Sequence, residues 1–175
     1  MKAQPTNTLK RIIVLLVIII VTYGCGRSQE EINMSQLQER NGVYYKVNSE
    51  TPYTGLVFVK YPNGQKQVEF TYKDGKRDGT GTRWRENGQK QEEVTYKDGK
   101  LEGTATTWYE NGQKKAEVTY KDGEFDGPFT IWYENGQKKQ ECTYKEGKED
   151  GLLTLWEENG QKKQEVTYKD GERVD

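Results

Sequence analysis

The sequence predicts an all-β fold, an elongated single-layer array of stacked antiparallel β-hairpins built from 24-residue repeats and preceded by an N-terminal signal or anchor segment. An Asn-Gly-Gln-Lys block returns at a constant step of 24 residues, beginning at Asn63, Asn87, Asn111, Asn135 and Asn159. A Tyr-Lys-Asp/Glu-Gly block follows each copy, with its glycine at Gly75, Gly99, Gly123, Gly147 and Gly171. A fixed period in this range indicates units that close a core only by stacking on their neighbours.

The composition agrees with a thin β structure. Hydrophobic residues make up only 31% of the chain and charged residues equally 31%, a balance that can indicate disorder. The 12 Tyr, 4 Trp and 19 regularly placed Gly favour repetitive β structure with a one-sided core instead.

Charge and residue types exclude several classes of function. The net charge is −1, so no basic patch suggests nucleic acid as a partner. The chain has no histidine, which removes the commonest general base and the commonest zinc ligand. We therefore expect no catalytic residue, no metal site and no cofactor. The two cysteines, Cys25 and Cys142, stand in very different contexts, and we do not expect a disulfide between them.

Residues 1–24 resemble a signal peptide. Lys10-Arg11 precede an apolar run from Ile12 to Val21, which is too short for a spanning helix of roughly 20 residues. Gly24-Cys25 resembles the end of a bacterial lipoprotein signal, in which the cysteine is lipidated after cleavage. The alternatives are an ordinary cleaved signal or an uncleaved anchor. We expect an exported protein held at the cell membrane or outer membrane through Cys25.

The segment from residue 25 to residue 40 is polar and has no sustained apolar face. It predicts a tether that lifts the repeats off the membrane, with a short helix near Glu30 to Gln38. Residues 41–175 then form the repeat domain, and residues 41–58 form an irregular N-terminal cap, because Lys60 stands where later units have tryptophan.

Each repeat predicts a hairpin, because Asn-Gly between two β-compatible segments is the strongest short hairpin signal. In the third unit Thr104 to Tyr109 is the first strand and Lys114 to Lys121 the second, and Asp122-Gly123 begins a wider turn. Valine and tyrosine alternate along the second strand, which makes theirs the core face. Cys142 takes a valine's place and is expected to be a small buried hydrophobe.

The side on which the tryptophans lie depends on the hairpin loop. A two-residue turn would put Trp84, Trp108, Trp132 and Trp156 opposite the valine and tyrosine face. A three-residue loop with a bulge would bring them onto it. We favour the bulge, because it gathers tryptophan, valine and tyrosine into one stack.

On that choice, the residues that vary between repeats lie on the opposite side of the first strands and become more apolar toward the C-terminus. An exposed apolar strip on a repeat protein is a candidate partner surface, although the same residues could instead cover a second small core. The predicted surface consists of Tyr109, Phe129, Ile131, Tyr133, Leu153 and Leu155.

The motif carries a family likeness. Tyr-Lys-Asp-Gly-Lys-x-(Asp/Glu)-Gly followed by Trp-Tyr-Glu-Asn-Gly-Gln-Lys-Lys resembles the variant MORN repeat, a bacterial hairpin repeat. With Asn-Gly-Val-Tyr-Tyr-Lys at 41–46 and Thr-Pro-Tyr-Thr-Gly at 51–55, the arrangement is similar to the YwqK-type antitoxin family. The resemblance implies a hairpin array that neutralises a toxin by binding it, and often a lipoprotein. It implies no catalytic residue.

Three classes of function follow. We expect a non-enzymatic, membrane-tethered scaffold that holds a protein partner, either a toxin-like or an envelope protein. An envelope lipoprotein that binds choline or glycan is the alternative, since Trp-Tyr pairs can form aromatic cages. An enzyme is disfavoured, because adjacent carboxylates such as Glu92 and Glu93 face opposite sides of a strand.

Overall fold

The structure is a computed structural model that describes residues 30–174. The predicted signal peptide (1–24) and the lipid attachment site Cys25 lie outside the described residues. Within them, no helix is long and apolar enough to span a bilayer.

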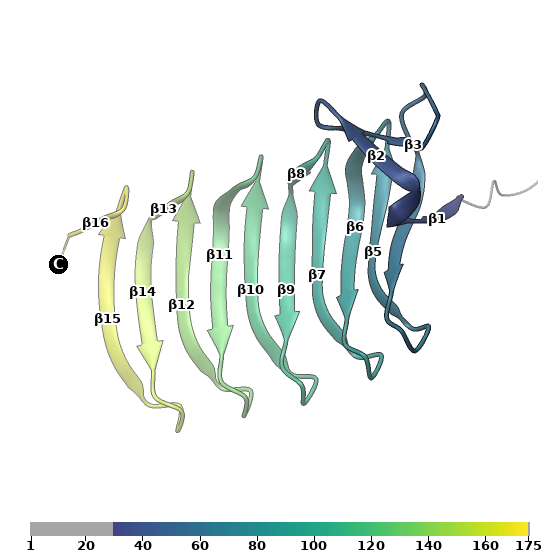
Figure 1. Ribbon diagram of the computed structural model, residues 1–175. Helices are drawn as coiled ribbons and strands as arrows, with labels where there is room; N and C mark the ends of the chain where they lie inside the picture. The colour runs from purple at the N-terminus through teal and green to yellow at the C-terminus, as the bar shows by residue number, and fades with distance from the viewer. Residues whose placement is uncertain (1–29, 175) are drawn as a thin grey trace, which may run out of the picture.

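The fold is a long open sheet of 14 strands, nearly all antiparallel, as the repeat predicted (Figure 1). From β4 onward the sheet is a meander of successive antiparallel hairpins, and β1 is added in parallel at its N-terminal edge. The strands are β1 (Glu31–Asn33), β4 (Gly55–Lys60), β5 (Lys66–Lys73), β6 (Lys76–Trp84), β7 (Lys90–Lys97), β8 (Lys100–Leu101), β9 (Gly103–Trp108), β10 (Lys114–Lys121), β11 (Glu124–Trp132), β12 (Lys138–Lys145), β13 (Lys148–Glu149), β14 (Gly151–Trp156), β15 (Lys162–Lys169) and β16 (Glu172–Arg173).

Residues 30–40 are part of the folded domain, and the prediction that they belong to a polar tether is wrong for this stretch. β1 pairs in parallel with β4, and Ile32 is buried. A single 3-10 turn, η1 (Met34–Gln36), replaces the expected helix and is closed by a capping box between Asn33 and Gln36. One buried isoleucine and a short capped turn produce no hydrophobic periodicity, so the sequence pattern could not predict that this stretch is folded.

The N-terminal cap is a second, two-stranded sheet of β2 (Leu37–Arg40) and β3 (Val43–Lys46). Figure 1 shows it lying across the N-terminal end of the long sheet. Beneath it Ile32, Tyr53, Val57 and Tyr72 form the main buried cluster, against which Met34, Leu37, Tyr44 and Phe70 pack. The cap therefore supplies a second layer over the first repeat, and it extends from residue 30, before the predicted start at 41.

The Asp-Gly connections are tight turns. Lys121 pairs with Glu124, so only Asp122 and Gly123 lie between the strands, both at positive φ (53° and 94°). A two-residue turn with positive φ at both positions matches the twist of the strands it joins. The wider turn expected here is therefore absent, and the extra length is absorbed farther on, where the β10–β11 register shifts between Val118 and Tyr120.

Candidate functional site

The long sheet has two chemically different faces. One carries the alternating second-strand residues Val94, Val118, Cys142 and Val166 with Tyr96, Tyr120, Tyr144 and Tyr168, and is called the Val–Tyr face below. The other, the Lys–Trp face, carries the residues between them. Cys142 on the Val–Tyr face is a free, buried thiol with 3% of its surface exposed, which confirms its predicted place. Burial raises the pKa of this thiol, which makes it less reactive.

The tryptophans lie on the Lys–Trp face, so the predicted placement is wrong although both predicted features are present. The Arg85 amide donates to the Gln89 carbonyl, which closes a three-residue Glu-Asn-Gly loop. Trp84 then pairs with Lys90, but Arg83 pairs with Glu92, so one residue bulges out between these pairs. The loop shifts the register by one residue and the bulge shifts it back. Trp84 thus lies on the face of the sheet that points away from the valines, as it would with a two-residue turn.

The bulge also organises the Lys–Trp face. Because one residue is skipped, Lys114 and Glu117 share a face and form an ion pair at a spacing of three. The Lys114 ammonium lies 5.7 Å from the ring centroid of Trp132 in the next repeat. Equivalent contacts join Lys90 to Trp108 and Lys138 to Trp156. This face is a ladder of contacts between neighbouring repeats.

The variable apolar residues lie on the Val–Tyr face, and not opposite it as predicted. Phe129 pairs with Cys142 and Leu153 pairs with Val166, and paired residues of antiparallel strands point to the same side. Ile131 and Leu155 lie on this face by the same register. Instead of forming a separate strip, these four side chains enlarge the core face, where they are half-buried.

An aromatic cluster marks the middle of this face. The Phe125 ring lies 5.0 Å from Tyr120, 6.2 Å from Phe129 and 5.2 Å from Tyr144, measured between centroids. Phe129 contacts Tyr144 edge-on at 5.7 Å. Burial is the first cause that raises the pKa of Tyr144, to about 12. Phe125 is not among the predicted surface residues, because its place on this face depends on the register shift between Val118 and Tyr120.

Tyr109 and Tyr133, the other two predicted surface residues, are built into the array. The Tyr109 hydroxyl donates to the Trp132 carbonyl at 2.8 Å, and Tyr133 donates to Trp156 at 2.9 Å. Arg85 stands in the second repeat where the third has Tyr109, and its guanidinium donates the equivalent hydrogen bond to the Trp108 carbonyl. Each bond spans 23 residues and ties a loop to the next repeat. These hydroxyls are thus used in stacking.

The described part of the Val–Tyr face is covered unevenly. The cap buries it over the first repeat, where Val57 and Tyr72 are each 1% exposed. From β9 to β15 its apolar side chains are mostly half-buried, and within residues 30–174 no second layer packs on them. Leu152 points to the other face, where 51% of its surface is exposed. Residues 30–174 contain no group of three or more metal-ligating side chains close enough to hold an ion.

Comparison with known proteins identifies the repeat. The model of the MORN repeat variant matches five times, at residues 53–74, 77–98, 101–122, 125–146 and 149–170. No curated protein sequence matches the chain.

Among solved structures, the accessory secretory protein 1, 2 and 3 assembly of Streptococcus pneumoniae matches at 11% identity and a TM-score of 0.35. The alignment covers 79% of this chain and 24% of that one. A mutant of TarM from S. aureus, in complex with Fondaparinux, alpha-GlcNAc-glycerol and UDP, matches at 12% and 0.34, with 85% of this chain on 24% of that one. This chain thus spans about a quarter of either structure. Likenesses this low carry no functional argument. The five matched repeats cover more than half of the sequence, and the chain belongs to the MORN repeat variant family.

Proposed function

We propose that this protein is a non-enzymatic scaffold, tethered to a membrane through Cys25, that binds a protein partner on the Val–Tyr face of its later repeats. The observation that supports this most is the half-exposed apolar side of a one-layer sheet. Antiparallel sheets normally pack one face on a core and leave the other in water. Within residues 30–174, the face with the core pattern has a second layer over the first repeat and none over the later ones.

The chemistry of the surface favours a protein over a small cation. Its centre holds Ile131, Leu153 and Leu155 beside the aromatic cluster of Tyr120, Phe125, Phe129 and Tyr144, and aromatic residues are enriched at protein interfaces. A choline cage would use the tryptophans, but the rings of Trp108, Trp132 and Trp156 already face lysine ammonium groups. These three described tryptophans therefore do not favour the choline alternative.

The binding proposal is tested with two leucines of one strand. Full-length tagged protein is purified from its membrane in detergent, and co-purifying proteins are identified by mass spectrometry. Leu155→Asp places a charge on the Val–Tyr face, whereas Leu152→Asp places the same charge on the other face. We expect Leu155→Asp to abolish capture of the partner and Leu152→Asp to retain it, with both variants folded by circular dichroism. Equal capture by both would exclude this surface.

An antitoxin or immunity role is the specific form of the proposal. If the partner is a toxin, co-expression of this chain should protect cells from the product of a neighbouring toxin gene, and Leu155→Asp should remove the protection. Survival that does not depend on Leu155 would contradict it.

The tether is tested separately. Cys25→Ala should move the protein from the membrane to the soluble fraction and remove incorporation of labelled fatty acid. Unchanged fractionation would instead indicate an uncleaved anchor.

A further inference from the structure

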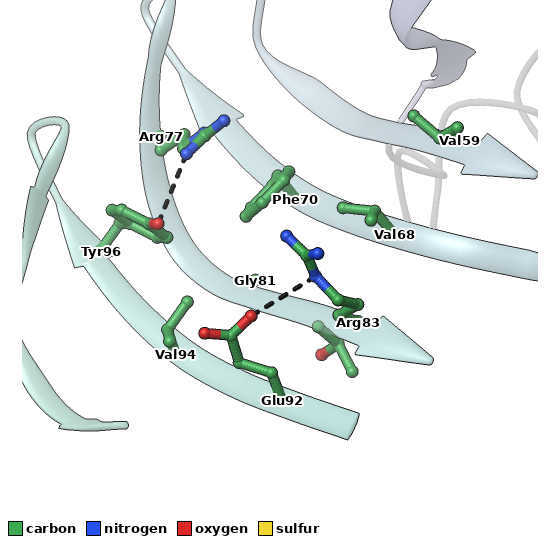
Figure 2. A pocket seen from close by; sticks show the side chains of 10 residues that line it. Val59, Val68, Phe70, Arg77, Gly81, Arg83, Glu92, Val94 and Tyr96 are labelled. Atoms are coloured by element: carbon green, nitrogen blue, oxygen red, sulfur yellow. Dashed lines mark hydrogen bonds and ion pairs between the residues drawn. The ribbon is translucent and has the colours of Figure 1, made fainter. Parts of the chain in front are cut away.

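A hollow of about 350 Å³ opens on the Val–Tyr face of the second repeat (Figure 2). Its apolar wall comes from Val68, Phe70 and Val94, and Arg77, Arg83 and Glu92 stand around it. This volume lies within the range of small-molecule sites, which combine apolar walls with a few polar groups.

Gly81 lines the hollow, and the Phe70 ring occupies the space that a side chain at Gly81 would need. A Cβ at this position would lie 2.5 Å from a carbon of the Phe70 ring. The equivalent residues in later repeats are Ala105, Phe129 and Leu153, so the second repeat has the smallest residue of the four at this position. Phe70 leans over the space that a side chain would fill, and the hollow opens beside it.

The two arginines are held differently, as Figure 2 shows. Arg83 forms an ion pair with Glu92, with 3.5 Å between Nε and Oε2. Arg77 lies 4.0 Å from the Phe70 ring centroid, and its Nε and Nη1 donate to the hydroxyls of Tyr72 and Tyr96 at 3.4 Å. Among the described residues, no carboxylate pairs with the Arg77 guanidinium. Arg77 is thus a partly buried cation beside an apolar hollow, held by two long hydrogen bonds.

The surroundings of Arg77 are basic. It also borders a second hollow of about 400 Å³, which is lined by Lys76, Lys100 and Asp98. The residues that line both hollows include four basic and two acidic side chains, and Lys100 also pairs with Asp122 outside them, so one positive charge is left in excess at this place. The electrostatic potential at this place therefore favours an anion.

We propose that the hollow binds a small organic carboxylate, with its apolar body against Phe70 and Val94 and its carboxylate on the Arg77 guanidinium. The planar fork of arginine matches a carboxylate, and such a bond is stronger beside apolar walls than in open water. Arg77 stands where the fourth repeat has Phe125, so the site belongs to the second repeat alone. It does not depend on the protein partner proposed above.

The test compares phenylbutyrate with its neutral amide by calorimetric titration of the full-length chain in lipid nanodiscs, with empty nanodiscs as the blank. We expect the wild-type protein to bind the carboxylate at least about tenfold more tightly than the amide. Arg77→Gln should bring this ratio to about one. The double variant Arg83→Gln with Glu92→Gln, the matched control in the same hollow, should leave it unchanged, because it removes an ion pair that carries no net charge.

Three results would overturn the site: no binding of either probe, equal binding of both to wild type, or a preference that survives Arg77→Gln. Acetate, which lacks the apolar body, should bind at least about tenfold more weakly than phenylbutyrate, and equal binding would reduce the site to surface charge. If Arg77→Gln does not fold, Arg77→Lys replaces it. That variant keeps the charge without the fork, so the ratio should fall but stay above one, and an unchanged ratio would contradict the proposal.

Discussion

In the first repeat, residues 53–74, the Val–Tyr face lies beneath the cap, whereas in the later repeats the same face carries half-buried side chains. Tyr72 is 1% exposed, but Tyr168, which occupies the same place in the fifth repeat, is only half-buried. The hairpins themselves have the same loops, bulges and pairing. The 24-residue motif therefore specifies the strands and their stacking, whereas a second layer over the core face must come from residues outside the motif.

The largest expected effect separates the covered repeat from the open ones. Tyr72→Ala should lower the free energy of unfolding by about 3–5 kcal/mol, as for other large buried side chains. Tyr168→Ala removes the same atoms from a half-covered site and should cost less than half as much. Urea unfolding of both variants measures the difference. Equal losses would mean that the cap adds no burial energy.

The next effect is a loss of stability at high pH that both regions share. Burial raises the pKa of Tyr53 under the cap, and that of Tyr144 in the aromatic cluster, each to about 12 from an ordinary value of 10. A raised pKa in the folded state favours the neutral phenol, so the stabilisation is complete below pH 10 and is lost between pH 10 and 12. Ultraviolet absorbance of the phenolate should show Tyr53 and Tyr144 titrating late, near pH 12.

Tyr53→Phe and Tyr144→Phe should each remove one of these late titrations. If only Tyr53→Phe does so, burial at the aromatic cluster is weaker than beneath the cap, and the two regions differ more than their geometry indicates.

A smaller effect should be equal in both regions. Tyr61 in the first repeat and Tyr109 in the third each donate to the carbonyl of a tryptophan 23 residues later. Substitution by phenylalanine removes only the hydroxyl, and each variant should lose about 1 kcal/mol in urea unfolding. A loss at Tyr61 alone would show that stacking between the open repeats contributes little.

The smallest effect concerns the Lys–Trp face. Lys114→Ala removes the ion pair with Glu117 and the contact with Trp132, but both partners remain solvated. We expect a loss below about 1 kcal/mol, and the ion-pair part of it should shrink as salt is added. A large loss that does not change with salt would mean that Lys114 acts through packing of its aliphatic stem.

Much of this fold follows from local patterns. The Asn-Gly loops, the Asp-Gly turns and the Val–Tyr alternation each depend on neighbouring residues, and all three are present. The face on which the tryptophans lie could not be predicted from local patterns. The three-residue loop at Asn87-Gly88 shifts the strand register by one residue, and the bulge at Gln91 shifts it back. The fold of residues 30–40 depends on contacts with β4 and β5, which leave no period in the sequence.

The candidate site was predicted less well than the fold. Phe129, Ile131, Leu153 and Leu155 lie together on one face, but on the side opposite to the one expected. The hollow beside Arg77 was missed. The sequence does show that Gly81 is smaller than the equivalent residue of every other repeat. That a hollow lies there depends on the position of the Phe70 ring on the neighbouring strand, which the sequence does not give.

The hydrogen bonds that span 23 residues have a consequence for how the length of this protein can change. The first four loops each find their acceptor in the following unit, three through a tyrosine hydroxyl and one through the Arg85 guanidinium. Removing or duplicating whole units would therefore recreate an existing boundary, whereas a change that is not a multiple of 24 residues would leave a loop facing the wrong carbonyl. Over evolutionary time the array can grow or shrink in steps of one repeat, and a step between the cap and the aromatic cluster changes the distance between them.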